Sequence, residues 1–155
     1  SAAIAKYDWA ENHLSVIDPP PPDTELYGGF VSLMVMEDNS LGLAGVQDFS
    51  LHLWSRKVKG AAKWVPCMVI DLEKIMPMAK PLKGNGANVV GFAEGLGVIF
   101  VSTDFGLFMI NLNSGQPKKV DEPGVYFSVL PYMSFYTGGI QRNHFYYFSD
   151  MHLKL

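Results

Sequence analysis

Few side chains of this sequence are spaced for chemistry, and the first of them are Asp104, Phe105 and Gly106. This tripeptide is the metal-binding motif of protein kinases, in which the aspartate holds magnesium. A kinase also needs a glycine-rich phosphate loop, a Val-Ala-x-Lys strand and a His-Arg-Asp loop, and the sequence has none of these. Apolar runs flank the tripeptide on both sides, so it predicts a hairpin turn between two strands.

Two glycine clusters are the next candidates, because glycine-rich loops cradle phosphates. They are Gly84-Asn85-Gly86 and Gly95-Leu96-Gly97. A phosphate loop lies between a strand and a helix and has the full GxGxxG spacing or a Walker lysine. Neither cluster meets these conditions, so we interpret both as turns and predict no cofactor-binding residue.

The histidines do not indicate a metal site, because they are scattered through the chain. None has a cysteine, a second histidine or a carboxylate at the spacing of metal ligands. His52 alternates with Leu51 and Leu53, so we expect it on the less buried face of a strand. The four histidines are His13, His52, His144 and His152.

No nucleophile or acid–base pair is indicated either. Cys67 lies in the apolar run 65–69, where a thiol is typically an inert filler. No GxSxG elbow surrounds a serine, and the acidic pairs Glu37-Asp38 and Asp121-Glu122 fall in predicted turns. We therefore predict no catalytic, cofactor or metal residue and a non-enzymatic protein. An enzyme is the alternative, because loops far apart in sequence can build a site.

The elements that would position any site are short strands, and the most apolar stretch is 89–112. It carries only two charges, Glu94 and Asp104, and its apolar runs end in turn residues. That pattern is typical of two or three buried strands joined by tight turns. Further strands are predicted at 13–17, 30–36, 41–46, 50–55, 64–72, 118–120, 125–136 and 145–148, with one helical turn at 71–76. Pro66 marks an edge strand or a bulge.

An internal repeat relates two of the predicted hairpins. The run 47–54 matches the run 103–110, which places Asp48 and Asp104 in equivalent turns 56 residues apart. A repeat near 50 residues with about four short strands indicates β-propeller blades. We predict an all-β fold of antiparallel four-stranded blades: a partial β-propeller of about two blades plus extra strands, with few or no helices. Two blades cannot close a ring, so neighbouring blades are expected from outside this chain or from a partner.

Five parts are expected along the chain. They are an N-terminal extension with a proline-rich connector (1–29), a first blade-like unit (30–79), a loop (80–88), a second blade-like unit (89–137) and a divergent C-terminal tail (138–155). Residues 18–23 predict a stiff polyproline II spacer, with a PxxP ligand as the alternative.

Single tryptophans and one aromatic cluster are the remaining candidates. We expect Trp54 and Trp64 to anchor blade packing rather than bind a ligand. Trp9 is a single aromatic in the extension. The cluster either closes the preceding blade as a strand or forms an interaction surface; it consists of Tyr126-Phe127, Tyr132 and Phe135-Tyr136.

Composition argues against several classes of function. Charged residues make up 17% of the 155, below the ~25% of an average soluble domain, and hydrophobic residues make up 48%. A net charge of −3, with no basic cluster above Lys118-Lys119, argues against nucleic acid and anionic membranes as partners. One cysteine, no Asn-x-Ser/Thr site, no signal peptide and no apolar run of about 18 residues favour the cytosol or the nucleus. The first residue is serine, which indicates a fragment or a processed chain.

The order of these motifs resembles one plant family. The motifs are the runs 31–42, 51–56, 64–65, 69–72, 90–95, 98–103 and 131–136. Together they resemble the grass-expanded family called domain of unknown function sixteen-eighteen, over roughly Leu14 to Thr137. More distantly, the Leu-x-Leu-Trp run at 51–54 and the tryptophan before Val-Ile-x-Leu are similar to the F-box-associated β-propeller repeat of plants. In such proteins the propeller is a recognition platform, and a separate F-box recruits a ubiquitin ligase. No F-box is visible here, so ligase membership is not carried over. The grass family has no established activity and no catalytic residues to carry over.

The expected function is therefore a non-enzymatic plant (grass) protein-interaction module. It would present loops such as 57–62 and 80–88 from a rigid stack of blades to a protein partner. Three alternatives stay open: the substrate-recognition part of an F-box-type ubiquitin ligase receptor, a small-ligand-binding or degenerate enzyme domain, and a truncated copy with no stable fold of its own.

Overall fold

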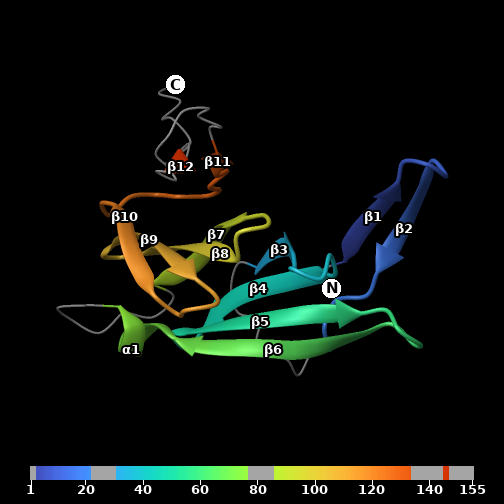
Figure 1. Ribbon diagram of the computed structural model, residues 1–155, viewed down its shortest axis with the longest axis horizontal. Coiled ribbons are helices and arrows are strands. Elements are labelled where there is room, and N and C mark those ends of the chain that lie inside the picture. Colours follow the sequence, from blue (N-terminus) through green and yellow to red (C-terminus); the bar gives the residue numbers. More distant parts are fainter. Residues whose placement is uncertain (1–2, 22–30, 77–85, 134–144, 147–155) are drawn as a thin grey trace, which may run out of the picture.

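The computed structural model describes residues 3–21, 31–76, 86–133 and 145–146, and nearly all of the regular structure there is β-strand (Figure 1). In chain order the strands are β1 (Ile4–Asp8), β2 (His13–Ile17), β3 (Val31–Val35), β4 (Leu41–Gln47), β5 (Ser50–Lys57), β6 (Lys63–Asp71), β7 (Ala87–Ala93), β8 (Val98–Thr103), β9 (Gly106–Asn111), β10 (Pro117–Asp121), β11 (Tyr132–Met133) and β12 (Phe145–Tyr146). The one helix among these residues is α1 (Leu72–Ile75). The predicted fold class is confirmed, and the strands predicted between 13 and 72 and at 118–120 are found to within two residues.

Eight strands form two four-stranded antiparallel sheets in which neighbours in the chain are neighbours in the sheet. The first sheet has the order β3-β4-β5-β6, and the second has the order β7-β8-β9-β10. The pairs β1-β2 and β11-β12 are separate two-stranded sheets. These meanders are the four-stranded, blade-like units that the repeat predicts.

The repeated hairpins have the same register but different turns. Gln47 pairs with Ser50 across one turn, and Thr103 pairs with Gly106 across the other. In the first turn Asp48 and Phe49 themselves adopt positive φ angles of 44° and 61°. In the second turn the residue with a positive φ is Gly106, at 133°, and glycine tolerates this angle because it has no Cβ. The kinase-like tripeptide is therefore a hairpin turn, as predicted.

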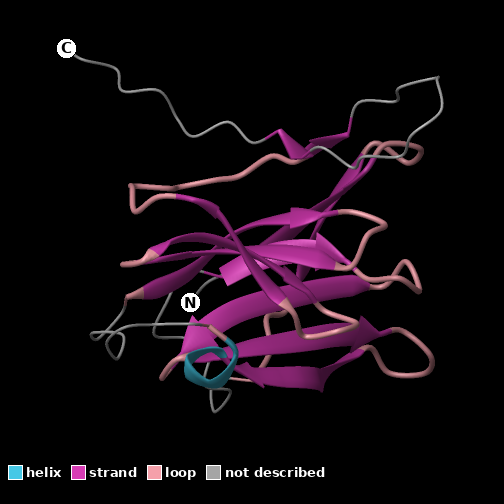
Figure 2. Cartoon of the chain, turned by 60° about the vertical axis from the view of Figure 1, so that its left-hand side comes forward, coloured by secondary structure: helices cyan, strands magenta, loops and turns pink. Residues whose placement is uncertain are grey.

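The two sheets pack face to face as layers (Figure 2). One buried cluster joins Met34, Ala44, Leu51 and Leu53 of the first sheet to Val89, Ile99, Val101, Phe108 and Ile110 of the second. Strand registers show which positions correspond: Leu43 to Ile99, Ala44 to Phe100 and Trp54 to Ile110. Side chains alternate between the two faces of a strand, so each face of one sheet corresponds to one face of the other. The face of the second sheet that packs on the first corresponds to the face of the first sheet that points away from the second. The sheets are therefore stacked in one direction, as successive repeats are.

The far face of the second sheet is covered by residues 122–131. Val129 is fully buried there in a second cluster with Val90, Phe100 and Leu107. Its N–H donates to the carbonyl oxygen of Val90 at 2.6 Å, beside a parallel bridge between Val129 and Gly91.

The expected strand at 125–136 is wrong for residues 125–131, which cross the sheet without forming a ladder. Pro123 and Pro131 lack an N–H, and the side chains of Val125, Phe127 and Leu130 are exposed. Of the remainder, Tyr132 and Met133 are strand and 134–136 lie outside the described residues.

The sheets come closest along β3, β4 and β7, and no comparably close approach joins β5 or β6 to the second sheet. The space between them therefore widens outward as a wedge. At one end of the strands α1 fills this wedge: the Asp71 side chain accepts from the N–H of Lys74, and Leu72 and Met76 are buried in the cluster between the sheets. The predicted helical turn at 71–76 is confirmed; Pro77 lies outside the described residues.

The N-terminal extension forms a hairpin beside the first sheet. The sequence predicts β2. It does not predict β1, because residues 4–8 lack a clear pattern. The rings of Tyr7 and Trp9 meet edge to face at 4.8 Å, with Trp9 almost fully exposed. Residues 18–21 are neither helix nor strand, as a proline connector should be, and 22–23 lie outside the described residues.

Candidate functional site

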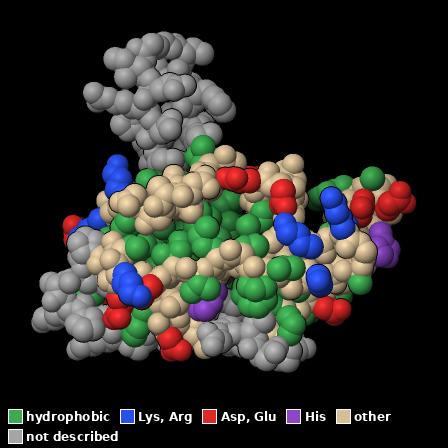
Figure 3. All heavy atoms as spheres, turned by 60° about the horizontal axis from the view of Figure 1, so that its bottom comes forward, with side chains coloured by type: hydrophobic (Ala, Val, Ile, Leu, Met, Phe, Trp, Pro, Cys, Tyr) green, Lys and Arg blue, Asp and Glu red, His purple; other side chains and the backbone are tan. Residues whose placement is uncertain are grey.

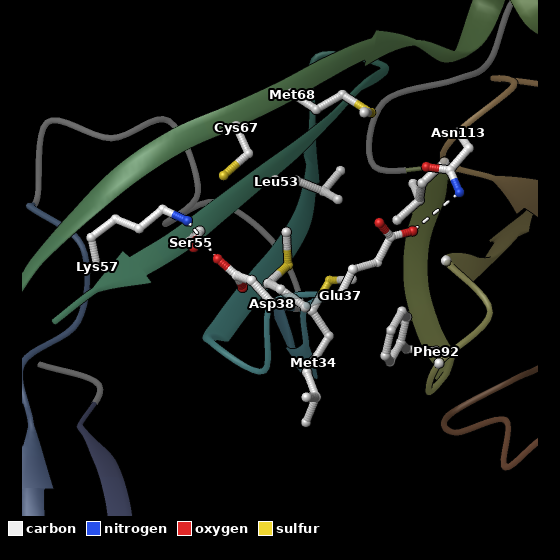
Figure 4. Close-up of a pocket in the computed structure, with 15 residues that line it drawn as sticks. Met34, Glu37, Asp38, Leu53, Ser55, Lys57, Cys67, Met68, Phe92 and Asn113 are labelled. Carbon is white, nitrogen blue, oxygen red and sulfur yellow. Dashed lines mark hydrogen bonds and ion pairs between the residues drawn. The ribbon is translucent and has the colours of Figure 1, made fainter. Parts of the chain in front are cut away.

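A cavity of about 310 Å³ opens between the sheets at the end of the wedge opposite α1 (Figure 4). Its walls are mainly apolar and come from both sheets: Met34, Leu53 and Met68 from the first, Phe92 and Leu112 from the second. Ligand pockets of proteins run from ~300 to 1,000 Å³ and are lined by apolar side chains with a few polar groups. This inter-sheet pocket lies at the small end of that range.

A bulge in β6 shapes the first-sheet wall. Leu53 pairs with Met68, but Trp54 pairs with Pro66, so Cys67 is left over between them. Proline cannot donate to a ladder, which confines it to edges and bulges, and β6 is an edge strand. The prediction for Pro66 is confirmed. The prediction that Cys67 is a packed filler is wrong, because the bulge puts this side chain on the exposed pocket wall.

Glu37 and Asn113 close one side of the mouth. Asn113 Nδ2 donates to Glu37 Oε1 at 3.1 Å, across 76 residues of sequence. Glu37 lies in the turn between β3 and β4, and Asn113 lies after β9, so the bond joins the sheets. No cation among the described residues pairs with the Glu37 carboxylate.

Asp38 and Lys57 form an ion pair of 2.8 Å on the other side of the mouth. The hydrogen bond from Lys57, helped by bonds from Ser40, holds the pKa of Asp38 well below its usual range. The same bond raises the pKa of Lys57. Below this pair Ser55 is buried, with its hydroxyl 2.9 Å from that of Ser40. The mouth thus holds two carboxylates and one lysine, and the lysine is already paired.

The outer face of the first sheet is a second candidate surface. We define it by Val31, Leu33, Leu43, His52, Trp54 and Val69, which share one face by register. Val31, Leu33 and Val69 are 46%, 48% and 61% exposed, whereas Leu43 is buried. Figure 3 shows apolar side chains gathered near the middle of one side of the molecule, with charged side chains around them. Contiguous exposed apolar patches often mark interaction sites.

The structure does not bring the predicted chemical candidates together. Gly95-Leu96-Gly97 is the turn between β7 and β8, as expected. His52 is half-buried on the outer face and His13 is exposed on the hairpin, while His144, His152, Gly84 and Asn85 lie outside the described residues. In the described part of the chain no group of three His, Cys, Asp or Glu side chains is placed to hold a metal ion. No helix of that part is long and apolar enough to cross a membrane.

The aromatic candidates have three different surroundings. Trp54 lies half-buried on the outer face. Trp64 Nε1 donates to the carbonyl oxygen of Asp18 at 2.7 Å, so this residue anchors the proline connector. The Tyr126 hydroxyl donates to Asp121 Oδ2 at 2.7 Å within the segment that covers the second sheet.

Sequence reasoning missed the pocket, although it placed Glu37-Asp38 in a turn correctly. The walls of the pocket come from four strands and three turns spread between residues 34 and 113. No local spacing signals such a set.

Comparisons with known proteins give no relative. Family models, curated proteins and solved structures were searched, and none matches this chain. The family resemblance therefore stays a prediction.

Proposed function

We propose that this chain is a non-enzymatic protein-interaction module, built as two neighbouring blades of a β-propeller-type stack in the cytosol or nucleus. The correspondence of faces carries the proposal. Positions of the second sheet that are buried against the first sheet correspond to the outer face of the first sheet, on which Val31, Leu33 and Val69 are exposed.

The outer face is the expected interface. In the second sheet the equivalent face is buried by another four-stranded sheet of the same kind. Repeats of this type have faces that need a neighbour on each side. A further sheet, from a longer form of the polypeptide or from a partner protein, would extend the same interface by one step.

Loops at the ends of the strands would add specificity. Residues 58–62 between β5 and β6 are all exposed, and loops held on a rigid scaffold commonly carry recognition. The second predicted loop, at 80–88, lies mostly outside the described residues. The core between the sheets supplies the rigidity on which this presentation depends.

Affinity purification with the full chain as bait tests the proposal. We would compare the wild type with the double variant Leu33→Glu/Val69→Glu, and use Leu14→Glu as the matched control. Leu14 is also an exposed apolar side chain, 64% accessible, but it lies on the N-terminal hairpin. Because two buried carboxylates would oppose docking, the double variant should lose proteins that the control retains.

The recovered protein would then be purified and titrated against the wild type, the double variant and the control to test for direct binding. Recovery of a ubiquitin-ligase adaptor through this face would place the chain in a ligase receptor. If no protein is retained specifically, or if the double variant retains the same set as the wild type, the proposal is wrong.

A further inference from the structure

We infer that the inter-sheet pocket binds a short helical segment of the partner, which inserts two large apolar side chains one turn apart and carries a Lys or Arg beside them. This inference rests on the proposed protein-binding function. It differs from the outer-face interface in position, in shape and in the chemistry of the occupant.

The occupant is argued from α1, which fills the same wedge at its other end. There Leu72 and Met76, four residues apart, lie between the sheets with 0% and 4% of their surfaces exposed. The pocket end has the same two sheets as its walls and lacks such a plug among the described residues. A one-turn helix with apolar side chains at i and i+4 is therefore the shape that this wedge already accepts.

The walls suit side chains of this kind. Met34, Met36 and Met68 line the cavity, and methionine adapts to irregular apolar partners because it is unbranched and polarizable. Phe92 forms part of the opposite wall (Figure 4). A volume of about 310 Å³ admits a pair of side chains rather than a whole helix face.

The charge at the mouth selects a basic neighbour. Asp38 is neutralised by Lys57, but the Glu37 carboxylate is bound only by the neutral amide of Asn113 among the described residues. The mouth therefore keeps one net negative charge. A Lys or Arg next to the apolar pair would meet this carboxylate without displacing the bond to Asn113, since the second carboxylate oxygen remains available.

A phage-displayed library of random dodecapeptides, selected on the full folded chain, tests the inference. We expect enrichment of peptides with two large apolar residues at i and i+4 beside a basic residue. A selected peptide, labelled with fluorescein, would then be titrated by fluorescence anisotropy. Met68→Trp fills the pocket and should weaken binding at least about tenfold, as loss of an anchoring contact does.

Two further variants keep this test sharp. Leu14→Trp places the same ring at an exposed position of the N-terminal hairpin, outside the pocket lining, and should leave peptide binding unchanged. Glu37→Gln retains the bond to Asn113 and should weaken binding about threefold. Added salt should reduce this difference between the variant and the wild type, because it screens the attraction between Glu37 and the basic residue of the peptide. Far-UV circular dichroism would verify that each variant is folded. If Met68→Trp does not fold, the comparison of Glu37→Gln with the wild type decides the test.

The inference is overturned by enrichment without the apolar pair, by unchanged binding to both Met68→Trp and Glu37→Gln, or by native mass spectrometry that finds a small molecule in the purified chain. Leu33→Glu/Val69→Glu separates the two proposals. If that variant loses the partner while the pocket variants keep it, the protein-binding function stands and the pocket inference fails. If no partner is found for any bait, the function itself fails.

Discussion

The first and second sheets share strand order, turn positions and register, but within the described part of the chain only the second has a packed layer on both faces. Its face toward the first sheet has Val101, Phe108 and Ile110, and its far face is capped by residues 122–131. The corresponding positions on the outer face of the first sheet are Gly45, His52 and Trp54. Equivalent backbones thus carry a core-like face in one copy and a mixed face in the other.

The mixed composition of the outer face supports its proposed role as an interface. A permanent core is uniformly apolar, whereas interfaces mix an aromatic anchor with smaller and polar residues. Trp54, His52 and Gly45 follow the second pattern. Under the proposed function this face meets water before docking, and Val, Phe and Ile at the positions of Gly45, His52 and Trp54 would enlarge its apolar patch and promote aggregation.

The largest expected effect separates core from interface. Phe100→Ala removes a ring that is 0% exposed in the second sheet and should lower the free energy of unfolding by about 3–5 kcal/mol. Trp54→Ala on the half-buried outer face should cost less than half as much, because part of the ring already meets water. Urea denaturation measures both. Equal losses of unfolding free energy would show that the outer face is part of the core, and the contrast drawn between the two sheets would be wrong.

Gly91→Ala should uncap the second sheet. An added Cβ would overlap the carbonyl oxygen of Val129, so the covering segment must shift, at a cost of about 1–3 kcal/mol. The freed far face matches the inner face of the first sheet, so it should accept the outer face of another copy head to tail. Sedimentation velocity should then show concentration-dependent oligomers.

Two controls decide whether that assembly is the predicted one. Ser32 occupies the register position of Gly91 in the first sheet, and Ser32→Ala should stay monomeric if the wild type is. Adding Leu33→Glu to Gly91→Ala should abolish the oligomers. Oligomers that persist with Leu33→Glu would mean another surface is responsible.

Gly106→Ala should distinguish the two Asp-Phe turns. The second turn places its positive φ on Gly106, and an added Cβ would also meet the backbone oxygen of Asp121, so we expect a loss of about 2 kcal/mol. Ser50→Ala at the equivalent position of the first turn should change stability by less than about 0.5 kcal/mol. Thermal unfolding by circular dichroism checks both, and similar losses would contradict the assignment.

Much of the fold was predictable because its signals are local. Alternating or continuous apolar runs ended by Asp-Phe, Glu-Asp-Asn or Gly-Leu-Gly predict strands and turns, and the match between 47–54 and 103–110 predicts the repeat. The prediction of a strand at 125–131 failed because its strand-like composition is overridden by Pro123 and Pro131 and by the packing of Val129 on Gly91 and the second sheet.

The candidate site was not predictable, because it is a product of packing. Cys67 lies at a bulge of an exposed edge strand, and Glu37 meets Asn113 only when two sheets stack. Neither event has a signal in residue spacing. The correspondence of faces, by contrast, follows from the repeat once the register is known.

The smallest expected effect concerns the ion pair of the first sheet at the pocket mouth, Asp38–Lys57. Its pKa shift makes Asp38 a source of stability above its unfolded pKa of about 3.9, and this stability is lost as pH falls through the lower folded pKa. The contribution is slight, because Asp38 and Lys57 are about half exposed, at 54% and 49%. Lys57→Met should therefore lower the melting temperature at pH 7, and this deficit should shrink as the pH falls below the unfolded pKa toward the lower folded pKa of Asp38. The matched comparison is the Asp71–Lys74 pair at the start of α1, tested with Lys74→Met. There too the lysine lowers the pKa of the aspartate. A Lys57→Met deficit that persists unchanged at pH 2 would mean that Lys57 acts through packing rather than through its charge.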